Sequence, residues 1–256
     1  MSERLIYKNP PIEEALCEFR FLPSQDWDLT IPGKVHLKLG TEYSGKPQEQ
    51  KVVNFALNAQ EGQPPNISYG EGLAKVQLLT ENGRRIVAIG SDVLSVHMLR
   101  PYQITEHGGF SGWDEFKPRI KQALDAYWEI AQPQGVVRVG IRYINRIVIP
   151  EAEVRVEDYL LCALPVVTGL PNIQTNFMSR VEYQYDDGVR LVLSQGAIEA
   201  PPGHVGFLLD LDVTWDSPEC VNLDKSLAIA DNLRERERTA FEAIITDKAR
   251  ELFNAD

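Results

Sequence analysis

Apolar and polar residues alternate along several stretches of this chain, and the alternation predicts β-strands. Every second residue from Ala15 to Phe21 is apolar, whereas Glu18 and Arg20 fall on the opposite side. The two prolines that precede this stretch favour extended backbone and keep a helix from running into the strand. Further strands are expected over residues 50–57, 74–80, 85–90, 93–99, 135–150, 176–185, 189–198 and 205–215, with a hairpin turn at the sequence ENG.

Other stretches repeat apolar residues at three- and four-residue steps, which is typical of helices that pack one face on a core. Short helices are expected near residues 31–43 and 155–164. A long helix is expected over residues 113–131, where Pro118 fits only in or near the first turn. The last helix, over residues 222–253, would be about 45 Å long. We expect it to bend at Thr246 or to project part of its apolar stripe toward a partner.

The expected elements follow the same order in both halves of the chain: a strand, a short helix, several antiparallel strands and a long helix. This order predicts an α+β fold with a duplicated unit, an antiparallel sheet with a long helix on one face, in two pseudo-repeated halves. The sequence AQPQG marks the boundary between an N-terminal half, residues 1–134, and a C-terminal half, residues 135–256. A single continuous domain fits the same pattern.

The composition is that of an ordinary globular protein, since 43% of the 256 residues are hydrophobic and 25% are charged. A net charge of −11 repels the phosphate backbone, so a nucleic-acid partner is not expected. The N-terminus lacks the apolar segment of a signal peptide, and the three cysteines lie far apart without metal-ligand spacing. We therefore expect a cytoplasmic protein with no membrane segment, no metal site and no cofactor.

Three segments carry a resemblance to a known family: NPPIEEALCEFRF near the start, VRVGIRYINRIVIP in the middle and AFEAIITDKARELF near the end. Together they look like a sporadically distributed, uncharacterised family of prokaryotic proteins of about this length. Its members share an N-terminal NPPI-E motif, a central R-Y-x-N-R strand and a C-terminal F-x-x-x-I-T helix. The resemblance transfers no catalytic residue, and the patchy distribution implies exchangeable gene cassettes such as conflict or defence modules.

The central strand over residues 135–150 carries three arginines on one face, and aligned guanidinium groups can bind an anion or a partner's carboxylates. These arginines are Arg138, Arg142 and Arg146. The alternative is a ladder of ion pairs with the aspartates that share one face of a later strand, which are Asp210, Asp212 and Asp216. Arg180 extends either arrangement. The pair of aspartates at 210 and 212 has no third ligand nearby, so a metal site is not expected.

No motif of a nucleophilic, zinc-dependent or phosphate-loop enzyme occurs in the sequence, so no catalytic residue is assigned. We expect a non-enzymatic protein-binding or assembly module that contacts another protein, or its own copy, through a face of the sheet or through the terminal helix with its apolar stripe at Phe241 and Ile244. The charged run RERER beside this stripe is expected to be a solvated helix face. The alternative is an enzyme or sensor that binds a phosphate-bearing or nucleotide-like ligand through Arg180 and the three arginines of the central strand.

Overall fold

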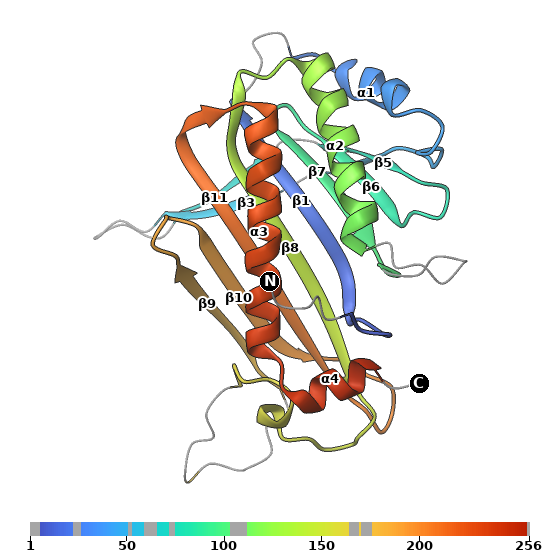
Figure 1. The fold of residues 1–256 in the computed structure, drawn as a ribbon. Helices are drawn as coiled ribbons and strands as arrows, with labels where there is room; N and C mark the ends of the chain where they lie inside the picture. The colour runs from blue at the N-terminus through green and yellow to red at the C-terminus, as the bar shows by residue number, and fades with distance from the viewer. Residues whose placement is uncertain are drawn as a thin grey trace.

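In the computed structural model a nine-stranded antiparallel sheet forms the centre of the protein, and the helices pack on one of its faces (Figure 1). The structure describes residues 6–22, 27–50, 53–58, 66–71, 75–102, 112–163, 169 and 176–254. The strands lie in the order β2 (Gln48–Gln50), β5 (Lys75–Leu79), β6 (Arg85–Ile89), β7 (Val93–Leu99), β1 (Ile12–Leu22), β8 (Gly135–Ile149), β11 (Val205–Val221), β10 (Arg190–Ile198) and β9 (Met178–Gln184). A separate two-stranded sheet pairs β3 (Val53–Asn58) with β4 (Asn66–Glu71).

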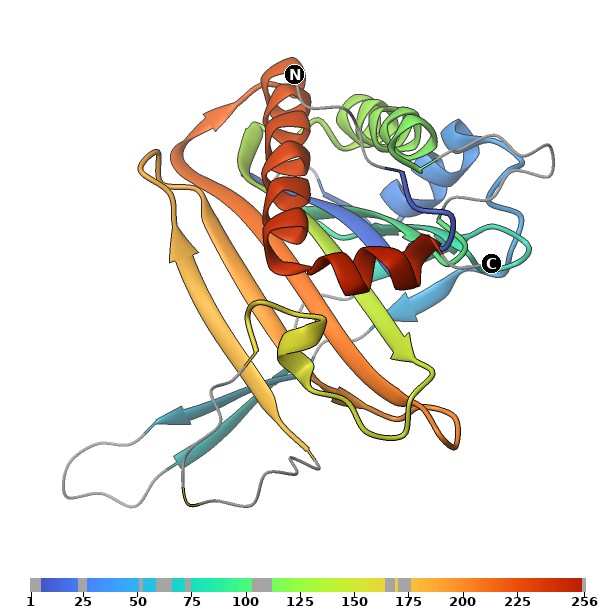
Figure 2. The ribbon, with the colours of Figure 1, turned by 60° about the horizontal axis from the view of Figure 1, so that its bottom comes forward.

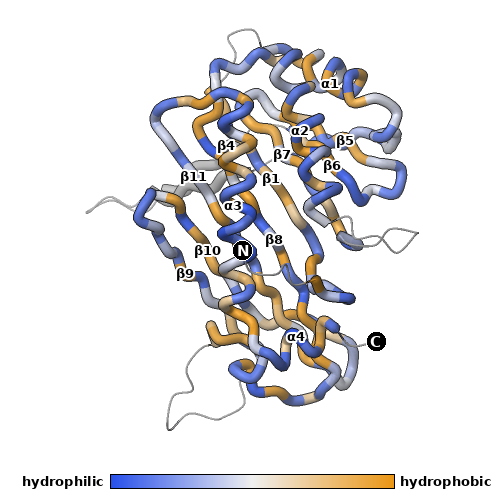
Figure 3. Tube along the Cα trace, viewed as in Figure 1, coloured by the Kyte–Doolittle hydropathy of each residue, from blue (hydrophilic) through white to orange (hydrophobic). Residues whose placement is uncertain are grey.

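The central strands β1 and β8 pair with each other and so join the two halves of the chain in one sheet. Hydropathy alternates along these strands because successive side chains point to opposite faces (Figure 3). On the face toward the helices, Phe19, Ile141 and Leu211 are completely buried. The apolar set that the alternation singled out is therefore the core of the protein.

The helices of the described residues all lie on one face of the large sheet (Figure 2). They are α1 (Ile31–Leu39), α2 (Gly112–Ala131), α3 (Leu223–Ile244), α4 (Asp247–Asn254) and a single 3-10 turn, η1 (Val156–Asp158). Helix α3 packs on β8 and β11, and α2 packs on β7 and α1. Within the described part of the chain, no helix combines the length and the apolar composition needed to cross a membrane.

The mixed α+β fold is confirmed, and three details refine it. The last helix is interrupted between Ile244 and Asp247, which confirms the expected bend. The helix near residues 155–164 is only the turn η1, and the one near residues 31–43 ends at Leu39. The expectation for Pro118 is wrong, because α2 begins at Gly112 and the proline lies inside the helix. The helix continues past it because Phe116 and Ile120 on either side are buried in the core.

The three segments that carried the family resemblance meet at one end of the sheet. The Asn9 amide donates to the Phe253 carbonyl over 2.8 Å, and the Arg146 amide donates to the Pro11 carbonyl over 2.8 Å. The ring of Tyr7 packs edge-on against Phe241 and Phe253. The residues from Tyr7 to Pro11 therefore hold the first strand against β8 and the C-terminal helix, which is a structural role.

Candidate functional site

The face of the large sheet opposite the helices is built largely from charged residues, and we call it the polar face. It takes every second residue of three adjacent strands, because neighbours along a strand point to opposite faces. Its central residues are Glu14, Leu16, Glu18, Arg20, Arg138, Gly140, Arg142, Ile144, Asp210, Asp212, Thr214 and Asp216. The register of β1, β8 and β11 places them side by side in one continuous surface.

Arg142 and Asp210 form the best-defined ion pair of the polar face. Arg142 Nε donates to Asp210 Oδ1 over 2.8 Å, and Nη2 donates to Oδ2 over 2.6 Å. The Arg142 side chain is 39% exposed, whereas the Asp210 side chain is only 11% exposed. The hydrogen bond to Asp210 raises the pKa of the Arg142 guanidinium. This fork is one rung of the ion-pair ladder expected from the sequence.

The other predicted arginines do not gather around Arg142. Arg138 lies 3.6 Å from Asp216, and Arg146 donates to the Glu199 carbonyl over 3.0 Å. Arg180 lies on β9, at the edge of the sheet and three strands from β8, where it pairs with Glu182. Three strand spacings amount to roughly 14 Å. The structure therefore brings Arg138 and Arg142 onto one surface but does not make the four arginines a single anion clamp.

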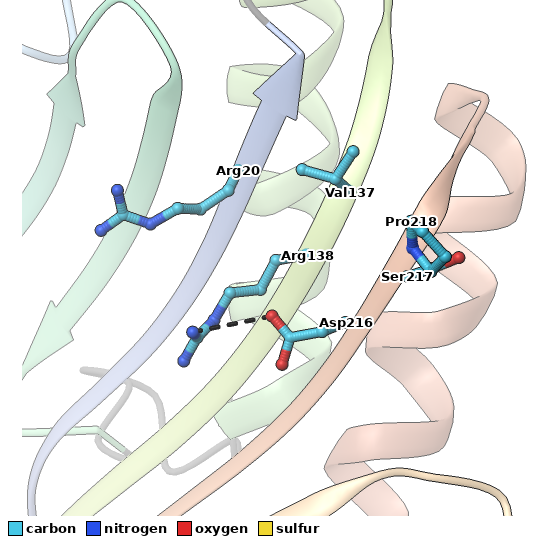
Figure 4. Close-up of a pocket in the computed structure, with 6 residues that line it drawn as sticks. All are labelled: Arg20, Val137, Arg138, Asp216, Ser217 and Pro218. Atoms are coloured by element: carbon cyan, nitrogen blue, oxygen red, sulfur yellow. Dashed lines mark ion pairs between the residues drawn. The ribbon is translucent and has the colours of Figure 1, made fainter.

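A pocket of about 380 Å³ opens on the polar face where two strands depart from regular pairing (Figure 4). The β1–β8 register shifts at Val137, and the β8–β11 register shifts between Asp216 and Val221. Bulges of this kind bend a strand and re-aim its side chains. The pocket is lined by Arg20, Val137, Arg138, Asp216, Ser217 and Pro218.

Arg20 is the charged residue of this pocket that the sequence did not indicate. Alternation placed it on the polar side of its strand, but only the register puts it opposite Arg138. Arg20 Nε donates to Glu18 over 3.0 Å, and Asp92 lies 3.8 Å from its Nη1. Two guanidinium groups thus line one pocket while each also contacts a carboxylate of the same chain.

Asp212 lies in the middle of the polar face, opposite Arg142 in the register. Burial raises the pKa of its carboxyl group, although Arg142 and Arg138 act in the opposite direction. Glu18 and Glu14 extend the network toward β5 and β7, where Glu18 accepts from Lys75 Nζ over 3.3 Å and Glu14 lies 2.6 Å from His97 Nδ1. The surface therefore carries charges of both signs in close pairs.

The apolar stripe expected to bind a partner is covered by this chain. Phe241 is 9% exposed and stacks on Phe253, with ring centroids 6.2 Å apart. Ile244 is half-buried and packs against the core. The expectation of a free stripe fails because the break at residues 245–246 lets α4 fold back over the end of α3.

The expectation that RERER is solvated is also wrong for two of its residues. The Arg234 guanidinium lies over the Tyr143 ring at 4.9 Å and donates to Glu237 over 3.2 Å. Glu237 is 4% exposed, and burial raises the pKa of its carboxyl group to about 7. Both residues lie on the side of α3 that packs on the sheet. Charge alternation in the sequence gives no sign of this, because it does not show which side of the helix faces the core.

The cysteines lie in three different environments. Cys17 is fully buried, as its place on the apolar side of β1 predicted, and burial raises the pKa of its thiol well above the ordinary value. Cys162 is half-buried, and its thiol donates a hydrogen bond to Gln195 Oε1. Cys220 is exposed. Across the described ranges, no group of three or more histidine, cysteine and acidic side chains is placed to hold a metal ion.

The chain was also compared with models of known protein families and with curated proteins. Neither comparison gave a match.

Proposed function

We propose that this protein is a binding or assembly module whose polar face contacts another protein. The observation that carries the proposal is the pairing of Arg138 and Arg142 with carboxylates of the neighbouring strand. A small anion would have to displace the buried Asp210 from its fork with Arg142. A protein surface with charges of both signs can instead add contacts at the exposed side of each pair.

The same pairing argues against nucleic acid as the partner. Binding to a phosphate backbone requires unpaired positive charge on one face. On the polar face Arg20, Arg138 and Arg142 each lie next to an acidic side chain. The whole chain carries a net charge of −11. The half-buried apolar residues Leu16 and Ile144 lie between the pairs, and apolar contacts of this kind suit a protein partner.

The proposal is tested by native mass spectrometry of the full chain after incubation with a lysate of its source cell. We expect a second protein at fixed stoichiometry. Ile144→Lys should abolish the complex, because it removes an apolar contact and places a charge in the interface. Its neighbours in the register are Glu14 and Asp210, which can accept the lysine without unfolding the protein.

The matched control is Leu37→Lys in α1, where the leucine is 84% exposed on the helix side of the molecule. The control variant should retain the complex. Equal binding by wild type, Ile144→Lys and Leu37→Lys would exclude the polar face as the binding surface.

The second candidate is a sensor or enzyme for a phosphate-bearing ligand, favoured by the two guanidinium groups of the pocket at Arg20 and Arg138. It predicts that inorganic phosphate or a nucleotide raises the melting temperature, because a ligand that binds only the folded state stabilises it. Arg138→Ala should abolish the shift, and Arg155→Ala on an exposed loop should keep it. An unchanged melting temperature across a phosphate and nucleotide series contradicts this candidate.

The proposal also includes the duplicated architecture and the setting implied by the resemblance, an accessory component of a mobile or defence-type gene cassette. The strand order supports duplication: β7, β6 and β5 follow outward from β1 as β11, β10 and β9 follow from β8. In each half the strand next to the centre leads directly into a long helix in sequence. Genomic neighbours of the coding sequence test the proposed setting.

A further inference from the structure

The last strand of the large sheet, β9, has an outer edge with which no strand of the described chain pairs. Its large apolar side chains are exposed to solvent: Met178 is 87% exposed, Val181 43% and Tyr183 49%. A sheet edge of this length presents a row of unpaired amide and carbonyl groups, and another strand can bind to it. Natural edges are often blocked by proline or lysine, and β9, with the sequence MSRVEYQ, contains neither.

The hydrogen bonds to β10 determine which backbone groups of β9 point outward. The Tyr185 amide donates to the Val189 carbonyl, and the Ala197 amide donates to the Phe177 carbonyl. The odd-numbered residues of β9 therefore face β10, because hydrogen-bonded and non-bonded pairs alternate in an antiparallel ladder. The amides and carbonyls of Arg180 and Glu182 consequently point outward, away from β10.

We infer that β9 pairs with β9 of a second copy of this chain, antiparallel and centred on Val181. In this register the outward amide and carbonyl of Arg180 bond to the carbonyl and amide of Glu182 in the other copy. The two-fold axis repeats this pair, so that it occurs twice in the dimer. Each guanidinium then lies opposite a carboxylate, on the polar side of both sheets. Val181 contacts its own counterpart on the helix side, which covers an exposed apolar residue.

The charges select this register among those that the backbone allows. A shift by one residue is excluded, because an outward-facing residue would then meet an inward-facing one. A two-fold axis at Arg180 or at Glu182 would place like charges directly opposite each other, which is destabilising. Only the axis at Val181 makes both charged pairs attractive. Arg180 and Glu182 already form an ion pair in one copy, at 2.5 Å, and the dimer would hold four alternating charges together.

This inference goes beyond the proposed function, since it concerns the sheet edge and a second copy rather than the polar face and another protein. The first test is the mass of the full chain in solution, by light scattering over a range of concentrations. We expect a dimer for wild type, and a monomer for Arg180→Glu, in which two acidic pairs face each other. The double variant Arg180→Glu/Glu182→Arg restores opposite charges in the same register and should restore the dimer.

Lys121→Glu on the exposed side of α2 is the matched control, because it reverses a charge far from β9 and should remain dimeric. A monomer for wild type at every concentration overturns the inference. A dimer that persists unchanged in Arg180→Glu overturns it as well, because the contact must then lie elsewhere. Loss of the dimer without rescue in the double variant contradicts the proposed register.

A cross-link tests the register without reversing any charge. In a non-bonded antiparallel pair the Cα atoms lie about 4.5 Å apart, within the range of a disulfide bond. Val181→Cys, made together with Cys220→Ser to remove the exposed native thiol, should give a covalent dimer on mild oxidation. Tyr183→Cys in the same background should not, since the two copies of residue 183 would be roughly 14 Å apart. Cross-linking of Tyr183→Cys but not Val181→Cys excludes the axis at Val181.

Discussion

The pair formed by Arg142 and Asp210 shows how one residue of the polar face contributes to stability. Asp210 is nearly buried and accepts two hydrogen bonds, whereas Arg142 keeps contact with water. Removing one partner leaves the other charge with a desolvation cost that nothing offsets. Because the pair is partly exposed, solvent screening limits the free energy that the attraction between the two charges adds to stability.

We therefore predict a coupling free energy of about 1 kcal/mol between Arg142 and Asp210. The measurement is urea unfolding of Arg142→Ala, Asp210→Ala and the double variant, analysed as a double-mutant cycle. Arg155 and Glu157 form an exposed pair and serve as the control, for which no measurable coupling is expected. Equal coupling in the two pairs would show that the partial burial of Asp210 has no effect.

Glu237 gives a second prediction at the scale of one residue, because its carboxyl group is buried beneath α3. Its pKa is raised from 4.5 to about 7, so the folded protein holds a proton between these values that the unfolded chain releases. The free energy of unfolding therefore falls as the pH rises through this window. The contribution to stability is present below pH 4.5, amounts to at most about 3 kcal/mol, and is lost above pH 7.

Glu237→Gln should remove this part of the pH dependence and be more stable than wild type above pH 7. Denaturant unfolding at a series of pH values measures the difference between the two proteins. Glu235→Gln, on the exposed side of the same helix, should follow wild type at each pH. Parallel curves for wild type and Glu237→Gln would mean that the carboxyl group titrates at its ordinary pKa.

At the scale of the element, the break between α3 and α4 depends on Thr246. Its hydroxyl donates to the Asp158 carbonyl over 2.5 Å and accepts from the Ala249 amide over 3.3 Å. Its own amide donates to the Tyr159 carbonyl over 3.1 Å. The threonine therefore caps the N-terminus of α4 and ties it to the turn η1.

We predict that Thr246→Ala lowers the free energy of unfolding by about 1 to 2 kcal/mol, as expected for the loss of a helix cap. Thr239→Ala is the control, because this exposed threonine lies inside α3 and bonds only to the carbonyl four residues earlier. Alanine favours a helix interior, so the control should be neutral or slightly stabilising. A similar loss of stability in both variants would argue against capping by Thr246.

At the scale of the whole molecule, the pairing of β1 with β8 makes one sheet and one core from both halves of the chain. We predict a single cooperative unfolding transition, because the halves share their largest buried surface. Far-UV circular dichroism and tryptophan fluorescence should give the same midpoint in urea. Three tryptophans lie in residues 1–134, and Trp215 reports on the second half.

The comparison with Trp215→Phe completes this test. The variant reports fluorescence from the first half alone and should unfold at the same urea concentration by both methods. Two separated transitions, or different midpoints for the two probes, would show that the halves unfold independently.

Local features of this protein follow from the amino-acid pattern alone. Alternation of apolar and polar residues predicted the strands of the large sheet other than β2, and which of their sides is buried, because side-chain direction in a strand repeats every two residues. The single strand expected over residues 50–57 is wrong, since Gln50 belongs to β2 of the large sheet and Val53–Asn58 forms β3 of the small sheet, and β4 was not predicted. It also predicted α2, α3 and the bend near Thr246, since apolar spacing follows the helical repeat. The arginines of the central strand were placed correctly on one face for the same reason.

Which of these faces meet depends on contacts between distant parts of the chain. Register placed Arg20 opposite Arg138, and it placed Arg142 opposite Asp212 and diagonal to Asp210, to which Arg142 bonds. Alternation alone allows many other pairings of the strands. The fold-back of α4 covered Phe241, and the packing of α3 buried Arg234 and Glu237. Strand order left β9 at the edge. Contacts between residues far apart in the chain depend on how whole helices and strands pack together. A local pattern in the sequence does not predict that packing.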